Sequence, residues 1–242
     1  MLYLIGLGLW DENDLSLRAV ATLKKCDEIY AEFYTNKWLG SMEKLEEIAG
    51  KKIKALKRVD VEAEMLTDEA KKKNIALLVP GDPLVATTHF QLLIDAKQKD
   101  VKTEVVHASS IYTAVAETGL QLYKFGRTTT LAFIEKSFKP SSPYEVILEN
   151  RKAGLHTLVL LDVKESSYMT IGDGIEVLLE TGELLDKDTK IIACCQLGGS
   201  QKIKYGTMAS LAEDNPQETP AVIIIPGRLH FKEEEALKIY ES

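Results

Sequence analysis

The sequence predicts an α/β protein of two α/β domains, residues 1–119 and 120–242, with a largely parallel sheet in the first and a mixed sheet in the second. Three observations lead to this prediction. The chain has 242 residues, more than the roughly 150 of an average domain. Its first half alternates short apolar runs with amphipathic stretches, as strand–helix–strand units with parallel strands do. After Gly119 that regular alternation ends.

Composition and charge exclude several classes of protein. The hydrophobic fraction is 45% and the charged fraction 28%, which is typical of a globular chain. The net charge of -7 argues against a general nucleic-acid binder, because such proteins are usually basic. The apolar stretch Leu2–Leu9 is too short to cross a bilayer, so no membrane association is expected. The three cysteines have neither disulfide-framework nor zinc spacing, which favours a cytoplasmic location.

Short apolar runs bounded by polar residues are the expected strands of the first domain. They are Leu2–Ile5, Ile29–Ala31, Ile53–Leu56, Ile75–Val79 and Val101–His107. Helices are expected between these strands and after the last one, at 15–23, 42–49, 61–73, 90–97 and 111–118. Short polar side chains that accept from free N–H groups mark the helix starts. These N-cap candidates are Asp11, Asn13 and Asp14 for the first helix, Thr87 or Thr88 for the fourth, and Ser109 and Ser110 for the last.

The second domain has β-branched strands at less regular intervals. Strands are expected at Thr128–Ile134, Leu155–Val163, Ile191–Gln196, Lys202–Thr207 and Ala221–Ile225, helices at 144–151, 175–179 and 231–240, and a loop at Lys136–Pro143. The pair Gly198-Gly199 predicts a turn that makes Lys202–Thr207 the antiparallel neighbour of the preceding strand.

The stretch Asn74–His89, with the sequence NIALLVPGDPLVATTH, is the most informative part of the chain. A fully apolar run is followed by Pro-Gly-Asp-Pro, which forces a sharp turn at the carboxyl end of a buried strand. Ligands bind at such strand ends in open α/β sheets, and Asp82 is expected at that edge. The alternative is an ordinary strand–turn–helix connection in which Asp82 only caps the backbone.

Gly6-Leu7-Gly8 follows the first strand in the manner of a dinucleotide-binding fingerprint. The third glycine of that fingerprint is replaced by Asp11, whose charge would repel a pyrophosphate. An acid at the usual distance, Asp27 or Glu28, is present. The motif therefore indicates a tight turn that a ligand can approach closely, and a nicotinamide-dependent dehydrogenase is not favoured.

No side-chain motif in the sequence identifies a particular reaction. The four histidines, His89, His107, His156 and His230, have no metal-pair spacing, so no metal site is predicted. His230 follows the turn Pro226-Gly227-Arg228 and is the best of them for ligand contact. No nucleophile elbow or phosphate-binding loop occurs. We assign no catalytic residue, and this pattern favours a transfer in which the protein mainly positions an already reactive cofactor.

Several stretches, in order along almost the whole chain, resemble one family. They are Tyr3–Leu9 (YLIGLGL), Ala31–Thr35 (AEFYT), Gly81–His89 (GDPLVATTH), Ser110–Tyr112 (SIY), Tyr123–Gly126 (YKFG), Leu155–Leu158 (LHTL) and Pro226–His230 (PGRLH). The chain resembles the diphthine synthases of archaeal type, within the tetrapyrrole-methylase-like class of S-adenosyl-L-methionine-dependent methyltransferases. GDPLVATTH is the most specific of these stretches.

The resemblance implies two α/β domains with the cofactor in a cleft between them, and a homodimer. It implies methylation, with three methyl groups in archaeal members, of the amino group of a modified histidine on translation elongation factor 2, in diphthamide biosynthesis. S-adenosyl-L-homocysteine is the implied product. The implied cofactor contacts are Leu9, Asp82, Val85, Ser110, Ile111, Leu161, Leu197 and His230. Leu197 lies in a stretch that departs from the family pattern, CQLG where ARAG is common.

Other functions remain open from the sequence. A methyltransferase of the same class that acts on a corrin or porphyrin precursor, or on ribosomal RNA, would need a basic cleft, which the acidic composition does not favour. A protein that binds the cofactor without turnover has the same sequence pattern, and it would differ by forming no product with any acceptor.

Overall fold

The computed structural model describes residues 1–134, 142–164, 167–181 and 185–241. The chain divides into two compact units, Met1–Tyr112 and Thr113–Ser242. Each unit is built from a sheet and helices, so the predicted fold class is confirmed: α/β, with a parallel sheet first and a mixed sheet second. The predicted boundary between residues 119 and 120 lies a short way further along the chain and stays a prediction.

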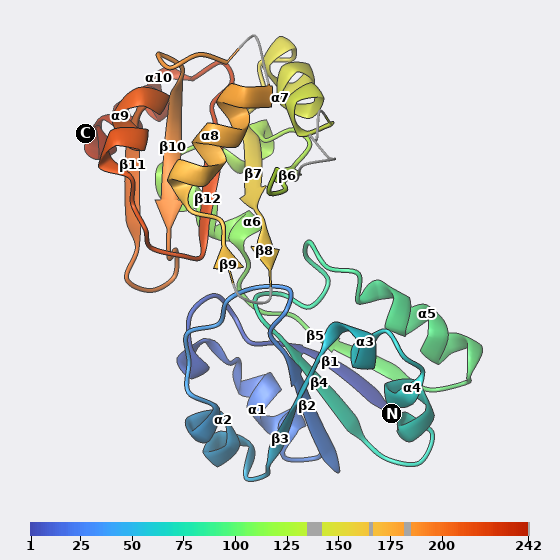
Figure 1. Ribbon diagram of the computed structural model, residues 1–242. Helices are drawn as coiled ribbons and strands as arrows, with labels where there is room; N and C mark the ends of the chain where they lie inside the picture. The colour runs from blue at the N-terminus through green and yellow to red at the C-terminus, as the bar shows by residue number, and fades with distance from the viewer. Residues whose placement is uncertain (135–141, 165–166, 182–184, 242) are drawn as a thin grey trace. The chain divides into compact units, whose positions relative to one another are not determined.

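The first unit is organised around a parallel sheet with the strand order β3-β2-β4-β1-β5 (Figure 1). The strands are β1 (Leu2–Gly6), β2 (Glu28–Glu32), β3 (Ile53–Leu56), β4 (Ile75–Val79) and β5 (Thr103–Val106). Strands β1 and β4 are buried along their whole length, because an apolar run without alternation suits a strand that is covered on both faces. All five predicted strands are confirmed: β3 and β4 have the predicted bounds, and the ends of the other three differ by at most two residues.

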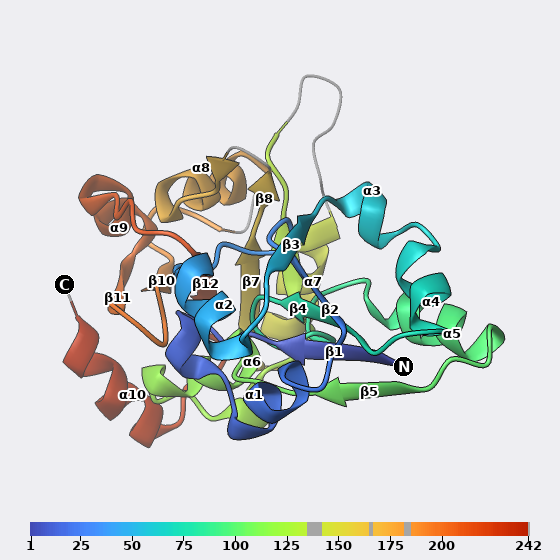
Figure 2. The same cartoon turned by 90° about the horizontal axis from the view of Figure 1, so that it is seen from below.

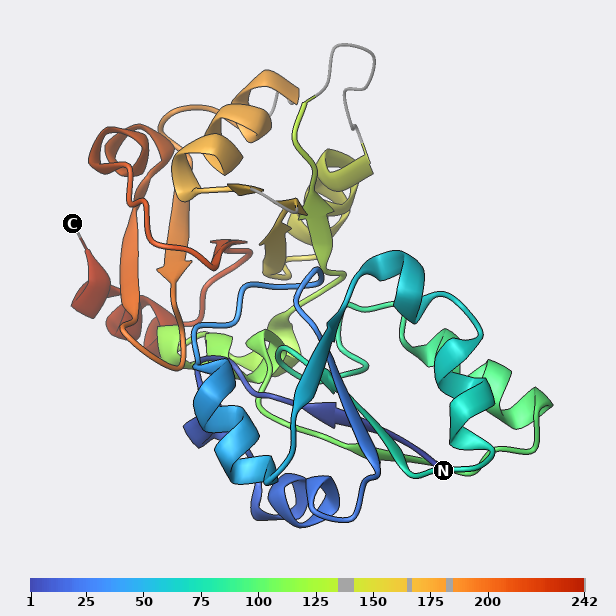
Figure 3. The same cartoon turned by 60° about the horizontal axis from the view of Figure 1, so that its bottom comes forward.

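Helices cover both faces of this sheet. They are α1 (Leu17–Leu23), α2 (Met42–Ala49), α3 (Arg58–Val61), α4 (Met65–Ala70) and α5 (Phe90–Gln98). Figure 3 shows α1 and α2 on one side of the sheet and α3, α4 and α5 on the other. Two separate apolar clusters, one on each face, contain the side chains that these helices bury.

Three predicted helix details in this unit are wrong. Ser16, whose Oγ accepts from the Ala19 N–H at 3.1 Å, caps α1, while Asp11 caps a preceding 3-10 turn. His89 precedes α5, because the Thr87 hydroxyl donates instead to the Pro83 carbonyl at 2.7 Å. The helix expected at 61–73 is interrupted, because α3 ends at Val61 and α4 covers only Met65–Ala70.

The reason for that break is the spacing of the buried residues. Val61 and Leu66 are five positions apart, and both are buried. Residues five apart lie on different faces of one straight helix, so a single helix cannot bury both side chains against the same sheet. The chain therefore ends α3 after Val61 and starts again at Met65.

The second unit has a mixed sheet with the order β11-β10-β12-β7-β6, in which only β6 and β7 are parallel neighbours. The strands are β6 (Thr129–Leu131), β7 (Thr157–Leu161), β10 (Lys190–Cys195), β11 (Lys202–Thr207) and β12 (Ala221–Ile225), and a separate two-stranded sheet pairs β8 (Val163–Lys164) with β9 (Ser167–Tyr168). The predicted antiparallel pairing of β10 with β11 is confirmed.

The helices of the second half again lie on two sides of the sheet. They are α6 (Ile111–Ala114), α7 (Ser142–Lys152), α8 (Ile171–Thr181), α9 (Met208–Asp214) and α10 (Phe231–Leu237). Side chains of α7, α8 and α9 join one apolar cluster with the strands. Figure 2 shows α10 on the opposite side of the sheet from α8 and α9.

Two predicted helices of this half end in tighter turns. The helix expected at 111–118 is α6 followed by a 3-10 turn at Val115–Thr118, and Gly119 ends it with a φ of 81°. The helix expected at 231–240 is α10 followed by a 3-10 turn at Lys238–Tyr240. The predicted loop at 136–143 lies mostly outside the described residues, although its last two residues already belong to α7.

Two classes of feature are missing from the part of the chain that the structure describes. None of its helices is both long and apolar enough to cross a membrane. Nor do its histidine, cysteine, aspartate and glutamate side chains form a group of three or more that could hold a metal ion.

Candidate functional site

The two glycine turns at the carboxyl ends of β1 and β4 meet each other. The Gly8 N–H donates to the Gly81 carbonyl at 3.2 Å, and the Gly81 N–H donates to the Gly8 carbonyl at 2.7 Å. Both glycines have a positive φ, 80° and 69°, which other residues rarely adopt. A Cβ at Gly6 would lie 2.5 Å from the Gly81 carbonyl oxygen and 2.6 Å from the Ala108 Cβ. Glycine at position 6 thus permits the close approach of three strand ends.

Asp82 connects the end of β4 to the end of β5. Its side chain is only 7% exposed. The Oδ2 atom accepts from the Ala108 N–H at 3.2 Å and lies 2.8 Å from Nδ1 of His107, while Oδ1 accepts from the Leu84 N–H at 3.1 Å. Both carboxylate oxygens thus have partners within the protein. The geometry matches the capping alternative, and a direct contact between this carboxylate and a cofactor stays a prediction.

The other predicted residues of the first unit surround the same sheet edge. Leu9 follows the β1 turn and Val85 follows Asp82 by three positions, and both are half-buried. Ser110 is buried, and Ile111 begins α6. Because β4, β1 and β5 are adjacent and parallel, the segments that follow them leave the same edge of the sheet. The structure therefore brings the first-unit candidates to one edge, as parallel topology predicts.

The backbone of Gly81 at this edge has free space beside it. Gly81 is buried, yet a Cβ added to it would meet no heavy atom within 4 Å. Ala86, directly after Val85, has a φ of 55°. Left-handed residues other than glycine are strained and concentrate at functional sites. The strained Ala86 and the apolar Val85 and Ile111 follow strands that end at this edge, and their contact with the adenosine portion of the implied cofactor stays a prediction.

In the second unit, Leu161 and Leu197 lie at one edge of the mixed sheet. Leu161 is the last residue of β7, and Leu197 comes two residues after β10. Strands β7 and β10 are both antiparallel to β12, so they run in the same direction. Both leucines are buried, with exposed fractions of 8% and 5%. Their positions agree with one apolar wall at this edge.

His230 is not brought to that edge. Strand β12 is antiparallel to β7, and its last residue, Ile225, is level with Thr157 at the beginning of β7. His230 follows five residues later as the N-cap of α10, where its Nδ1 accepts from the Lys232 N–H at 3.3 Å. The carboxyl ends of two strands share an edge of the sheet only when the strands are parallel. The sequence pattern alone did not show in which direction β12 runs relative to β7. The predicted cofactor contact of His230 stays a prediction.

A buried charged network holds the His230 segment, and the sequence analysis did not identify it. The fully buried Glu233 carboxylate lies 3.0 Å from Nε2 of His156, accepts from the His230 N–H at 2.8 Å and pairs with the Lys124 ammonium. Nδ1 of His156 accepts from the Gly227 N–H at 2.9 Å. The only local signal was the spacing of His230 and Glu233, which resembles a capping box.

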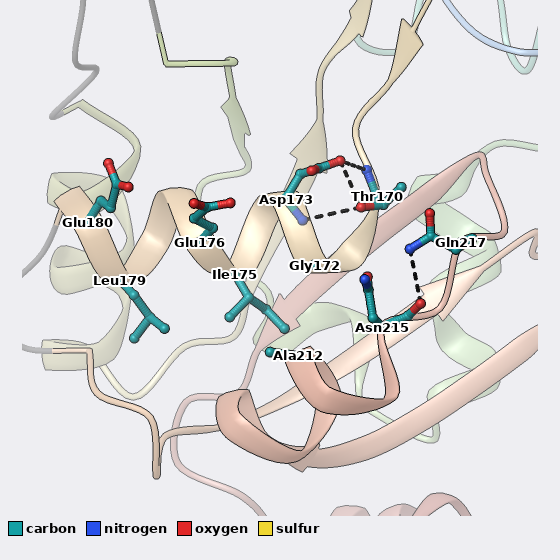
Figure 4. Close-up of a pocket in the computed structure, with 10 residues that line it drawn as sticks. All are labelled: Thr170, Gly172, Asp173, Ile175, Glu176, Leu179, Glu180, Ala212, Asn215 and Gln217. Carbon is teal, nitrogen blue, oxygen red and sulfur yellow. Dashed lines mark hydrogen bonds between the residues drawn. The ribbon is translucent and has the colours of Figure 1, made fainter.

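A hollow of about 560 Å³ lies between α8 and α9 of the second unit (Figure 4). Its lining combines α8 carboxylates with apolar side chains of both helices and amide side chains from the segment after α9: Thr170, Gly172, Asp173, Ile175, Glu176, Leu179, Glu180, Ala212, Asn215 and Gln217. Asp173 is already engaged, because it accepts from the N–H and hydroxyl of Thr170 at 2.8 and 2.7 Å. None of the predicted cofactor residues lines this hollow, so it is not part of the candidate site.

Comparison with known proteins agrees with this architecture. The family model of the tetrapyrrole (corrin/porphyrin) methylases matches residues 1–212. The diphthine synthase of Methanocaldococcus jannaschii is 47% identical over 98% of this chain and 98% of its own length. A crystal structure of diphthine synthase covers 100% of this chain and 96% of that chain, with a TM-score of 0.93 and 36% identity. A putative diphthine synthase from Entamoeba histolytica has a TM-score of 0.92 and 37% identity, covering 100% and 98% of the two chains.

The match over residues 1–212, together with the fold, makes this chain a methyltransferase of the tetrapyrrole methylase class. Within that class, the relatedness to diphthine synthases extends over almost the entire length of the chain. The chain belongs to the diphthine synthase family. The alternative of a corrin, porphyrin or ribosomal RNA methyltransferase is not favoured, because the full-length relatives have diphthine synthase names.

Proposed function

We propose that this chain transfers methyl groups from S-adenosyl-L-methionine to the amino group of the modified histidine on translation elongation factor 2, forming diphthine in diphthamide biosynthesis. The observation that carries the proposal is the full-length relatedness to diphthine synthases. The open sheet edge beside Gly81 supports it, because a buried backbone with free space above it can accept a small molecule closely.

The cofactor contacts that we propose lie in both units. They are Leu9, Asp82, Val85, Ser110, Ile111, Leu161, Leu197 and His230. Bound S-adenosyl-L-methionine supplies a methyl group that its sulfonium already activates. Val85 and Ile111 offer apolar contact to the adenosine portion. Asp82 contributes chiefly by holding the loop, because its oxygens are occupied by Ala108, His107 and Leu84.

The chain's main task in this reaction is alignment. The acceptor amine must be neutral when it attacks, and amino groups have pKa values of roughly 8 or higher, so the amine releases a proton to water before each attack. Holding two reactants in line can supply ~7–11 kcal/mol of the barrier. We therefore assign no dedicated base, and we propose three successive transfers to one nitrogen.

The test is a transfer assay with purified protein, methyl-labelled S-adenosyl-L-methionine and elongation factor 2 that carries the unmethylated histidine precursor. We expect label on the factor, and mass spectrometry of the modified peptide should show three added methyl groups. A factor whose histidine is unmodified is the control and should remain unlabelled. Absence of label on the precursor form would refute the proposed function.

We also propose that the protein works in the cytoplasm as a homodimer. Its cysteines at 26, 194 and 195 are free and buried, as in proteins of a reducing compartment. Sedimentation equilibrium measures the assembly directly, since one chain has a mass of 26.9 kDa. A mass that stays at one chain across micromolar concentrations would refute the dimer.

A further inference from the structure

Two of the family-like stretches meet in a buried cluster of titratable side chains. His89, the last residue of GDPLVATTH, is only 2% exposed. Its Nδ1 lies 3.3 Å from the Pro83 carbonyl oxygen, and its Nε2 lies 3.3 Å from the Tyr34 hydroxyl oxygen. Glu32, at the end of β2, is fully buried, and its carboxylate lies 3.8 Å from the same Nε2. No function described above uses these residues.

The partners of His89 determine its proton arrangement. A carbonyl oxygen only accepts hydrogen bonds, so Nδ1 must carry the proton that points at Pro83. Burial lowers the pKa of His89, which keeps the ring neutral and leaves Nε2 as an acceptor. Burial also raises the pKa of Tyr34 to about 12, so its hydroxyl keeps its proton and donates to Nε2. The result is a directional chain from Tyr34 through His89 to Pro83.

Glu32 holds Tyr34 in place within this chain. Its carboxylate accepts from the N–H groups of Tyr34 and Thr35 at 3.0 and 3.1 Å, and from the Thr35 hydroxyl at 2.5 Å. The Arg58 guanidinium carbon lies 5.3 Å from the centre of the Tyr34 ring. The residues after β2 are thereby fixed from two sides.

The other end of the chain acts on the loop that carries the proposed cofactor contacts. The Pro83 carbonyl accepts from both the Thr87 hydroxyl, at 2.7 Å, and His89 Nδ1. These two bonds close the segment from Pro83 to His89 on itself. Within that segment Ala86 is held at a φ of 55°, a conformation that is unfavourable for alanine. Loss of the His89 bond would remove one of the two side-chain bonds that hold Ala86 in this conformation.

We propose that His89 is a positioning residue for methyl transfer, which holds the Asp82–Val85 loop in its cofactor-binding conformation through Nδ1 and Pro83, with its tautomer set by Tyr34. This inference rests on the proposed use of S-adenosyl-L-methionine. His89 acts on the loop and not on the acceptor amine. Loss of its bond to Pro83 therefore weakens cofactor binding and leaves the transfer step of the loaded enzyme almost unchanged.

Two substitutions of His89 distinguish the role of Nδ1 from that of Nε2. His89→Asn keeps a donor near the Nδ1 position, and His89→Gln reaches towards the Nε2 position without a donor for Pro83. We expect His89→Gln to weaken S-adenosyl-L-homocysteine binding about tenfold in calorimetry, because the loop loses the bond from Nδ1 to Pro83 and Ala86 is released as well. His89→Asn should stay within about threefold of wild type. The KM for S-adenosyl-L-methionine should follow the same order, with kcat changed less than about twofold.

Several outcomes would overturn the inference. One is that His89→Gln and wild type bind S-adenosyl-L-homocysteine equally well. Another is that His89→Asn binds it as weakly as His89→Gln does. A third is that His89→Gln lowers kcat without changing the KM for S-adenosyl-L-methionine. If His89→Gln does not fold, Tyr34→Phe replaces it, and its binding should weaken by about threefold because the tautomer is no longer set. Failure of the wild-type protein to bind S-adenosyl-L-homocysteine would instead refute the proposed function.

Discussion

Replacement of Glu233 by glutamine should destabilise the second unit strongly. The buried carboxylate accepts from the N–H groups of Gln121 and His230 at 2.9 and 2.8 Å and lies 3.0 Å from Nε2 of His156. The Lys124 ammonium pairs with it. Glu233→Gln keeps the size of the side chain but removes its charge. The ammonium and the imidazole then lose their charged partner.

The size of the effect follows from two arguments. Burial by itself raises the pKa of Glu233, but the hydrogen bonds from Lys124, Gln121 and His230 outweigh it and lower the pKa from 4.5 to about 2. A difference of that size corresponds to ~3 kcal/mol of folding stability at neutral pH. Breaking a buried ion pair on one side costs ~3–5 kcal/mol. We therefore expect Glu233→Gln to lower the free energy of unfolding by about 3 kcal/mol at pH 7.

The effect should depend on pH in a defined direction. Because folding depresses the pKa of Glu233, the stability it contributes is complete above the unfolded-state value of 4.5 and is lost as the pH falls to about 2. The difference in unfolding free energy between wild type and Glu233→Gln should therefore shrink over that range. Other carboxylates with lowered pKa values, such as Glu28 and Asp68, also make stability depend on pH. They are present in both proteins, so their contribution cancels when the unfolding free energy of the variant is subtracted from that of wild type.

Urea titrations followed by far-UV circular dichroism at about pH 7 and pH 3 would measure this difference. Trp10 and Trp38 both belong to the first unit, so tryptophan fluorescence reports that unit separately. The matched control is Glu234→Gln, which changes the exposed neighbour and should cost less than about 0.5 kcal/mol. A loss below ~1 kcal/mol at pH 7, or the same loss at pH 3, would refute the reasoning.

Three further predictions test other parts of the fold. Gly6→Ala places a Cβ 2.5 Å from the Gly81 oxygen, and it should cost ~1–3 kcal/mol in urea titrations. It should also weaken S-adenosyl-L-homocysteine binding in calorimetry. The control is Gly50→Ala, whose added Cβ meets no heavy atom within 4 Å and which should leave binding unchanged. Equal binding by wild type, Gly6→Ala and Gly50→Ala would contradict this. Asn150→Ala removes a buried amide that bonds to the Arg127 backbone and the Thr157 hydroxyl, and it should cost ~1–3 kcal/mol, so that an unchanged urea midpoint would be the contrary result. Burial raises the pKa of all three cysteine thiols, so a disulfide reagent should modify three thiols in urea and almost none in native protein, and rapid native reaction at pH 8 would show that they are accessible.

Much of the fold was predictable because strand positions depend on local composition. The apolar runs at Leu2–Ile5 and Ile75–Val79 can only be buried, and each is a central strand. Helix starts were less predictable, because several side chains compete for each free N–H group. Ser16 rather than Asp14 caps α1, since Asp14 accepts from the Trp10 N–H at 2.7 Å.

In the candidate site, too, some features follow from the local sequence and others only from the tertiary structure. Asp82 could be placed at a sheet edge from the strand and turn around it, and the structure puts it there. Its bond to Ala108 at 3.2 Å, across 26 positions, has no local signal. The same is true of Glu233 and His156, which are 77 positions apart. Neither Glu233 nor His156 lies in a sequence motif that predicts burial, and only the fold brings the two side chains together in the interior.

The sequence by itself determined the class of fold, the order of its strands along the chain, and the family-like turns at Gly6–Leu9 and Gly81–His89. These features depend on burial of apolar runs and on backbone angles that glycine and proline allow, and both act over a few residues. Tertiary structure alone decided strand direction in the second sheet, and therefore the edge that holds His230. It also decided which buried charges meet, because a carboxylate is stabilised by the donors around it in space, whatever their distance along the chain.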